Sequence, residues 1–87
     1  MSEELIVTIR DYILQNFLFT DDASAIALDD SLLDNGIVDS TGMMEIITFL
    51  EADLGIKVAD EDMTPENLGS INRLAAYVSR RRDVVDS

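Results

Sequence analysis

The chain has 87 residues, a formal net charge of -12 and a hydrophobic fraction of 47%. That fraction is too high for a disordered acidic tail and suits one small folded domain. A domain of this length buries only about 60% of the surface that its unfolded chain exposes, which leaves no room for a deep, enclosed active site. The sequence contains no cysteine and no histidine, which excludes a disulfide framework, a cysteine nucleophile and the commonest general base. These limits favour a function at the surface of the domain.

The N-terminal residues, Met1 to Glu4, lack the basic region and the apolar stretch of a secretory signal. No apolar run in the sequence approaches the ~18 residues that a membrane-spanning helix needs. We therefore expect a cytoplasmic protein without a membrane span.

The acidic residues are unevenly distributed. Ten of them, and no Lys or Arg, lie in the segment that begins at Asp11 and ends before Ile56. The ten are Asp11, Asp21, Asp22, Asp29, Asp30, Asp34, Asp39, Glu45, Glu51 and Asp53. The negative electrostatic field of these residues would attract basic protein surfaces and repel nucleic acid and anionic lipid. On charge alone, a surface that only keeps the protein soluble explains the acidic residues equally well. The basic residues 80–82 suit the end of a helix and are too few for a nucleic-acid site.

Apolar residues near the N-terminus recur at the spacing of an amphipathic helix. They are Leu5, Ile9, Tyr12, Ile13 and Phe17. This spacing predicts a helix over residues 3–17, with Ser2 as its N-cap and with boundaries accurate to about 2 to 4 residues.

The pattern breaks between Leu18 and Val38. This connection is longer than the ~12 to 15 residues common in compact domains, so we expect it to be functional or firmly anchored. Its apolar residues are the expected anchors in the core, while the aspartates stay in water. These anchors are Ile26, Leu28, Leu32, Leu33 and Ile37.

A second helix is predicted to begin at Asp39 or Ser40, capped by one of those side chains, and to end before Gly55. With about 3.6 residues per turn, one face is apolar and the outer face is acidic with one exposed methionine. The inward residues are Met43, Ile46, Ile47, Leu50 and Leu54. The outward residues are Thr41, Met44, Glu45, Thr48, Glu51 and Ala52.

Two further helical segments complete the expected fold. A short one lies within residues 60–68, where Thr64-Pro65 resembles a cap followed by a first-turn proline. The last helix is expected from Ser70, as its cap, to Arg82, with Ile71, Leu74, Ala75 and Val78 directed inward. We therefore predict an all-α fold, a small antiparallel bundle of three main helices and one short helix. It forms one domain over residues 1–83, followed by a frayed tail at 84–87.

Ser40 is the most informative residue of the sequence, because it follows an aspartate at the start of a helix. A nucleophile elbow requires glycine two residues before the serine, where this chain has Val38, and no histidine is present for a triad. An EF-hand loop aligned on Gly36 would place Gly42 where a bidentate glutamate is required, so no metal site is predicted. Ser40 is therefore better interpreted as a point of attachment than as a catalyst.

The run from Leu33 to Ser40 and the helix after it resemble the acyl carrier protein family, which includes aminoacyl and peptidyl carrier domains. The resemblance extends over nearly the whole chain, through the helix order, the long first connection, the Asp39-Ser40 pair and the closing helix. In that family a separate synthase transfers 4'-phosphopantetheine from coenzyme A to the serine, and the terminal thiol carries an acyl or aminoacyl group as a thioester. The resemblance implies that Ser40 is the attachment site and that Asp39 is its motif partner.

The same resemblance implies a monomer that is not itself an enzyme. Its implied partners are a phosphopantetheinyl transferase, an acyl- or aminoacyl-loading ligase, and downstream acyl-transferring enzymes with basic docking surfaces. The positions that the family uses for docking correspond here to Thr41, Met44, Glu45 and Glu51.

The sequence departs from the usual Asp-Ser-Leu motif, because Thr41 and Gly42 follow the serine. Asp-Ser-x-Gly is similar to the D-alanyl and other stand-alone aminoacyl carriers, and the cargo stays open. A hypothesis from another class also stays open, namely an acidic helical adaptor that docks a basic partner without a prosthetic group.

Overall fold

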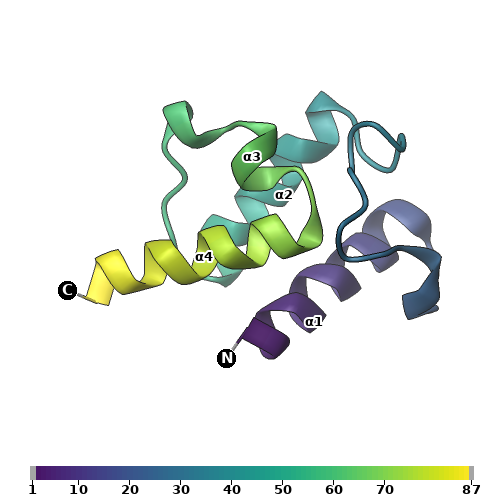
Figure 1. Cartoon of the computed structure of the whole chain (residues 1–87), viewed down its shortest axis with the longest axis horizontal. Coiled ribbons are helices and arrows are strands. Elements are labelled where there is room, and N and C mark those ends of the chain that lie inside the picture. Colours follow the sequence, from purple (N-terminus) through teal and green to yellow (C-terminus); the bar gives the residue numbers. More distant parts are fainter. Residues whose placement is uncertain (1, 87) are drawn as a thin grey trace.

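The part of the chain that the structure describes folds into four α-helices joined by connections of unequal length (Figure 1). The computed structural model describes residues 2–86, with side chains described for 3–82. The helices are α1 (Ser2–Ile13), α2 (Ser40–Asp53), α3 (Pro65–Leu68) and α4 (Ile71–Asp86). No strand occurs within 2–86. The prediction of an all-α fold with three main helices and one short helix is confirmed.

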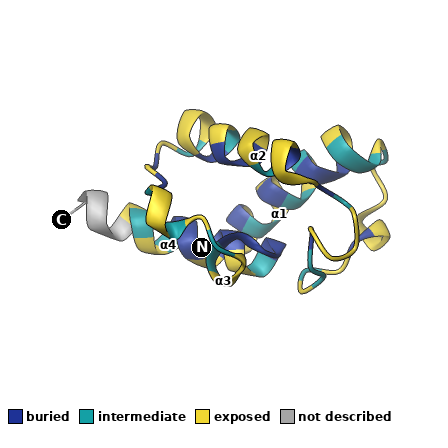
Figure 2. Cartoon of the chain, turned by 90° about the horizontal axis from the view of Figure 1, so that it is seen from above, coloured by how far each residue is buried: buried dark blue, intermediate teal, exposed yellow. Residues whose placement is uncertain are grey.

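The hydrophobic core lies between α1, α2 and α4. Helices α1 and α4 pack against each other and run in opposite directions (Figure 1), and α3 packs on α4. Figure 2 shows that the buried residues face inward on all three long helices, with exposed residues outside. The largest fully buried side chains are Ile9, Ile13, Leu14, Leu32, Ile46, Leu50, Leu68, Ile71, Leu74 and Val78. Each stabilises the fold by roughly 1.5 to 3 kcal/mol relative to an exposed position.

The first helix differs from its prediction at both ends. Ser2 is the first helical residue and not the N-cap before it, so that assignment was wrong. The α-helix ends at Ile13, and the next turn, η1 (Leu14–Leu18), is a π-helix. The chain leaves η1 at Phe19, whose backbone is left-handed, with φ 54°. A single π-turn leaves no mark on a 3.6-residue apolar pattern, so the sequence predicted one continuous helix.

The long connection between η1 and α2 is anchored, as expected, although one anchor was wrong. Ile26 and Leu32 are buried, whereas Leu33 is 41% exposed. The N–H of Leu32 donates to the carbonyl of Gly69 (2.9 Å), which ties this part of the connection to the chain just before α4. A second tie comes from Asn72, whose side chain donates to the Asp29 carboxylate at 2.6 Å.

The chain between α2 and α4 contains one 3-10 turn, η3 (Asp60–Asp62), and the short helix α3. Gly55, with φ 70°, follows the end of α2 as predicted. Thr64 occupies the N-cap position of α3, but its side chain makes no capping hydrogen bond there.

Helix α4 begins close to its predicted start and ends later than predicted. The Ser70 hydroxyl accepts a hydrogen bond from the Arg73 N–H at 3.2 Å, which agrees with the predicted cap. The helix reaches Asp86 instead of Arg82, so residues 84–86, which we expected in the tail, have helical backbone. Residue 87 lies outside the described residues, and the domain limit at 83 stays a prediction.

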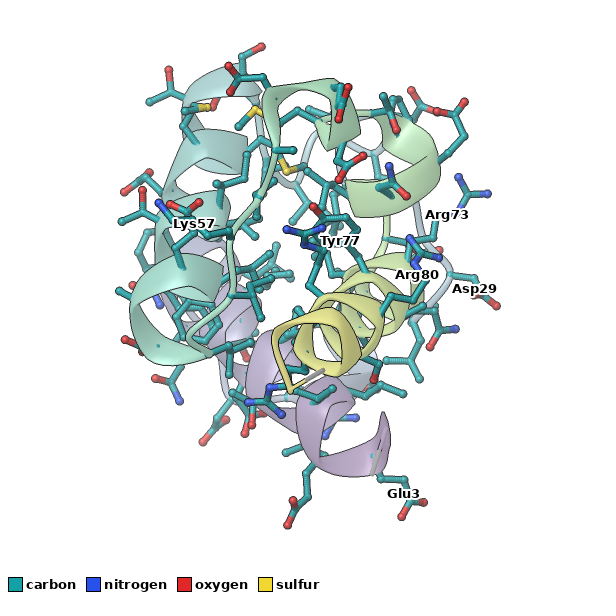
Figure 3. All side chains as sticks on the ribbon, turned by 90° about the vertical axis from the view of Figure 1, so that its left-hand side faces the viewer. Glu3, Asp29, Lys57, Arg73, Tyr77 and Arg80 are labelled. Carbon is teal, nitrogen blue, oxygen red and sulfur yellow. The ribbon has the colours of Figure 1, made fainter. Side chains whose placement is uncertain are left out.

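Side chains of α4 fasten the η3–α3 segment to the bundle. The buried hydroxyl of Tyr77 donates to the Asp62 carboxylate at 2.8 Å. The guanidinium of Arg80 lies over the Tyr77 ring, 5.7 Å from its centroid (Figure 3), and donates to the Asn67 side chain. Burial, followed by the hydrogen bond to Asp62 and its charge, raises the pKa of Tyr77 above 10.0. Tyr77 therefore contributes stability as the protonated phenol.

We expect Tyr77→Phe to lower the free energy of unfolding by about 1 to 2 kcal/mol at neutral pH, because Asp62 loses its buried donor. A raised folded pKa means that this contribution is complete below pH 10.0 and is lost as pH rises through the folded pKa. Urea unfolding of both proteins between neutral and alkaline pH should show the difference shrinking above pH 10.0.

Tyr12→Phe is the matched control for this prediction. Its hydroxyl makes a longer bond, 3.3 Å to the carbonyl of Glu45, at a half-buried position, so the loss should be smaller. Equal stability of wild type and Tyr77→Phe at neutral pH would contradict a structural role for the Tyr77–Asp62 bond.

Candidate functional site

Ser40 is the first residue of α2, and its side chain is exposed. The residue before it, Asp39, is the N-cap, with extended backbone and a carboxylate that accepts the Gly42 N–H at 2.7 Å. The sequence predicted that either Asp39 or Ser40 caps α2, and the structure shows that the cap is Asp39. The Ser40 hydroxyl is therefore not used for capping and is accessible for chemistry.

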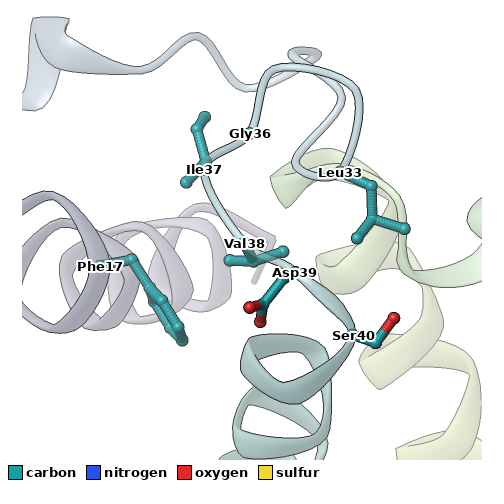
Figure 4. Close-up of a pocket in the computed structure, with 7 residues that line it drawn as sticks. All are labelled: Phe17, Leu33, Gly36, Ile37, Val38, Asp39 and Ser40. Atoms are coloured by element: carbon teal, nitrogen blue, oxygen red, sulfur yellow. The ribbon is translucent and has the colours of Figure 1, made fainter.

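Ser40 lies in an open surface groove of about 470 Å³ beside the start of α2. The groove is lined by Phe17, Leu33, Gly36, Ile37, Val38, Asp39 and Ser40 (Figure 4). Its walls thus come from the end of the first helical segment, the long connection and α2. In Figure 4 the side chains of Asp39 and Ser40 point to opposite sides of the chain, so the carboxylate is directed away from the hydroxyl.

The backbone ahead of Ser40 is fixed by a compact turn. The carbonyl of Leu32 accepts the N–H groups of both Ile37 (3.0 Å) and Val38 (3.1 Å). Gly36 turns the chain at a positive φ of 71°, a conformation that costs glycine little. Val38 is buried directly before the cap. These contacts hold the approach to α2 in one conformation and so set the position of Ser40.

Gly42 lets the first turn of α2 approach the end of η1. A Cβ at this position would lie 2.9 Å from Cε1 of Phe17 and 3.2 Å from Cβ of Val38, closer than van der Waals contact allows. The sequence analysis placed Phe17 among the apolar residues of the first helix and did not assign it to the site. A glycine inside a helical pattern is the signal that could have suggested a close contact there.

The start of α2 suits an attached phosphodiester. The N–H groups of the first turn have no acceptor within a helix, and Asp39 uses that of Gly42. Those of Ser40 and Thr41 remain for an anion at the positive end of the helix dipole. The exposed hydroxyl, the open groove and the free donors together fit a phosphorylated group bound through Ser40.

The residues expected to dock partners are spread along α2. Thr41, Met44 and Glu45 are exposed near its start, and Met44 is 53% exposed. Glu51 lies eleven positions after Ser40, about 16 Å along the helix axis. Its carboxylate accepts the backbone N–H of Val58 at 3.0 Å, so it also holds the chain after α2. The structure thus brings Ser40 together with Thr41 and leaves Glu51 apart.

An aromatic cluster on the α1–α2 side was missed by the sequence reasoning. The rings of Tyr12 and Phe49 stack with centroids 4.0 Å apart, and Phe17 meets Tyr12 edge to face at 6.0 Å. Burial, followed by the charges of Glu45 and Asp53, raises the pKa of Tyr12 above 10.0. The cluster joins the end of α1, η1 and α2 and so supports the Phe17 wall of the groove.

The described part of the chain lacks two other kinds of feature. Among the side chains that the structure describes, those of residues 3–82, no group of three or more is suited to bind a metal ion. None of the helices within residues 2–86 is both long and apolar enough to cross a membrane.

Comparison with known proteins identifies the family. Residues 5–78 match the family described as phosphopantetheine attachment site, and the chain belongs to this family of acyl carrier proteins. The family carries 4'-phosphopantetheine covalently. One relative is the D-alanyl carrier protein of Abiotrophia defectiva, 28% identical over 79 residues, which are 91% of this chain and 94% of that protein.

We expect Gly42→Ala to lower the free energy of unfolding by about 1 to 3 kcal/mol, because the added methyl group overlaps Phe17 and Val38. Alanine is the better helix former, so a propensity argument alone predicts the opposite sign. Urea unfolding measures the difference.

A double-mutant cycle with Phe17→Leu supplies the control, since shortening the ring should reduce the cost of Gly42→Ala. If Gly42→Ala is as stable as wild type or more stable, the close contact with Phe17 does not constrain α2.

Proposed function

We propose that this chain carries acyl or aminoacyl groups as thioesters on a 4'-phosphopantetheine arm attached to Ser40. The observation that supports this most directly is the exposed Ser40 hydroxyl at the first position of α2, with Asp39 as a separate cap. Membership of the family supports 4'-phosphopantetheine as the prosthetic group. The geometry at the start of α2 supports Ser40 as the residue that bears it.

The attachment reaction requires one exposed nucleophilic oxygen from this chain. The Ser40 oxygen would form a bond to the phosphorus of coenzyme A that bears the pantetheine. The phosphoanhydride bond would break, releasing adenosine 3',5'-bisphosphate, and the hydroxyl proton would pass to a base of the transferase. The Asp39 carboxylate accepts the Gly42 N–H and points away from the Ser40 hydroxyl (Figure 4), so a partner would supply the base. The arm then supplies the thiol that this cysteine-free chain lacks.

We further propose that the chain performs no reaction alone and presents its cargo to other enzymes. The first partners are a phosphopantetheinyl transferase and a loading ligase, followed by acyl-transferring enzymes. Exposed Met44 and the carboxylate of Glu45 would meet apolar and basic groups on them, with Thr41 beside the arm. Electrostatic docking gives fast, weak encounters, which suit a carrier that must leave each enzyme. Glu51 would contribute its charge, while its Val58 bond favours a mainly structural role.

For the cargo we propose the aminoacyl class. Two observations support it, the Asp39-Ser40-Thr41-Gly42 sequence and the similarity to the D-alanyl carrier protein of Abiotrophia defectiva. The cytoplasmic location and the monomeric state stay predictions.

The first test is enzymatic attachment of the arm. Incubation with coenzyme A and a broad-specificity phosphopantetheinyl transferase should add one phosphopantetheine mass to wild type and none to Ser40→Ala, as measured by intact-protein mass spectrometry. Ser79→Ala, on α4, is the control and should gain the same mass as wild type. A wild type that gains no mass with several active transferases would refute the carrier proposal. It would favour the acidic adaptor, whose binding to a basic partner is salt-sensitive and indifferent to Ser40→Ala.

A further inference from the structure

Phe19 is unusual in two independent respects. Its side chain is 83% exposed, more than any other large apolar side chain among the described residues. Its backbone is left-handed, with φ 54° and ψ 44°, and within 2–86 no other residue except glycine has a positive φ. Neither burial nor local backbone preference explains a phenylalanine at this position.

The left-handed position ends the π-turn of η1. Glycine or asparagine usually fills such a place after a helix, because a bulky L residue is sterically strained there. An exposed ring regains none of that cost through packing. A strained residue that the fold does not need is a reason to look for a role in binding.

The chain around Phe19 is firmly held. The N–H groups of Phe19 and Thr20 both donate to the carbonyl of Leu14, the latter at 3.1 Å. The hydroxyl of Thr20 accepts the N–H of Asp22 at 3.1 Å, and the Asp22 carboxylate in turn accepts from Ser24. The ring is thus presented from a fixed backbone, which lowers the entropy lost when a partner binds it.

Phe19 lies close to the Ser40 groove. Phe17, two residues earlier, lines that groove together with Ser40. Two residues span at most about 7 Å, so the Cα of Phe19 lies within that distance of the Cα of the groove-lining Phe17. Asp21 and Asp22 are exposed just beyond it, and no Lys or Arg lies between Asp11 and Ile56. A protein that covers the groove would therefore meet an aromatic ring bordered by negative charge.

We propose that Phe19 is an aromatic anchor for the phosphopantetheinyl transferase, which receives the ring in an apolar pocket bordered by Lys or Arg side chains. This inference rests on the proposed attachment at Ser40. Buried aromatic residues commonly dominate the energy of an interface, and complementary charge at the rim speeds and orients the encounter.

The geometry favours the transferase over the other partners. The transferase must bring its reacting atoms to the Ser40 oxygen itself, so its surface has to cover the groove and the chain beside it. Enzymes that act on the thiol at the end of a flexible arm can bind farther away. Phe19, two residues after the groove-lining Phe17, is placed for a contact with the enzyme that reaches the hydroxyl.

The test compares Phe19→Asn with Phe19→Tyr as substrates of a transferase that modifies the wild-type chain. Asparagine tolerates the left-handed backbone, so Phe19→Asn should melt at or above the wild-type temperature. Its KM as a carrier substrate should rise about fivefold or more with kcat little changed, while Phe19→Tyr should stay near wild type. Val7→Ala is the control, because Val7 is also exposed, at 43%, beside Glu3 and Glu4 on α1.

Each outcome decides the proposal. A smaller rise in KM for Phe19→Asn, or an equal rise for Val7→Ala, would overturn the anchor. A clear drop in melting temperature for Phe19→Asn would overturn it as well, by showing that the ring stabilises the fold. Absence of a mass gain in wild type itself would instead count against attachment at Ser40, which separates failure of this inference from failure of the carrier function.

Discussion

The hydrogen bond from the Gly42 N–H to the Asp39 carboxylate, 2.7 Å long, determines what Ser40 is able to do. Helix starts leave N–H groups without acceptors, and serine and aspartate are both good caps. Because Asp39 takes the capping role, Ser40 becomes the first helical residue and its hydroxyl faces solvent at the positive end of α2. Exchanging these roles would tie the serine to the backbone. The neighbouring aspartate thus gives the site a physical basis that holds even without the family match.

The same first turn is also tightly packed against the end of η1. Phe17 reaches Gly42 from the π-turn of η1, and the Tyr12–Phe49 stack supports that contact from the other side. The exposed groove is therefore built on rigid walls from two helical segments, although the connection between them is long. In a carrier, the rigid start of α2 and the flexible prosthetic arm would have different tasks. In the proposed function the protein would fix one end of the arm, while the cargo at the other end would move between enzymes.

Periodicity and capping signals predicted most of the fold, because the three long helices bury apolar faces at regular spacing. The Asp39-Ser40 pair and exposed Met44 also followed from the sequence. The remaining features depend on contacts between distant segments. Leu33 was assigned to the core because an irregular connection has no fixed period. The Glu51–Val58 bond and the Phe17–Gly42 contact require the relative placement of chain segments that spacing does not encode. The left-handed Phe19 contradicts the residue preference of its own position, so no propensity could predict it.

The proposed function depends on one covalently modified residue, Ser40. Peptide-level mass spectrometry of the protein purified from its own cells tests this most directly, because fragmentation assigns the modified residue and the thioester retains its cargo. We expect phosphopantetheine on the peptide that contains Ser40, localised to that residue, with an aminoacyl group on part of the population. A Ser40 peptide that is unmodified throughout, or an arm located on another residue, would contradict the claim.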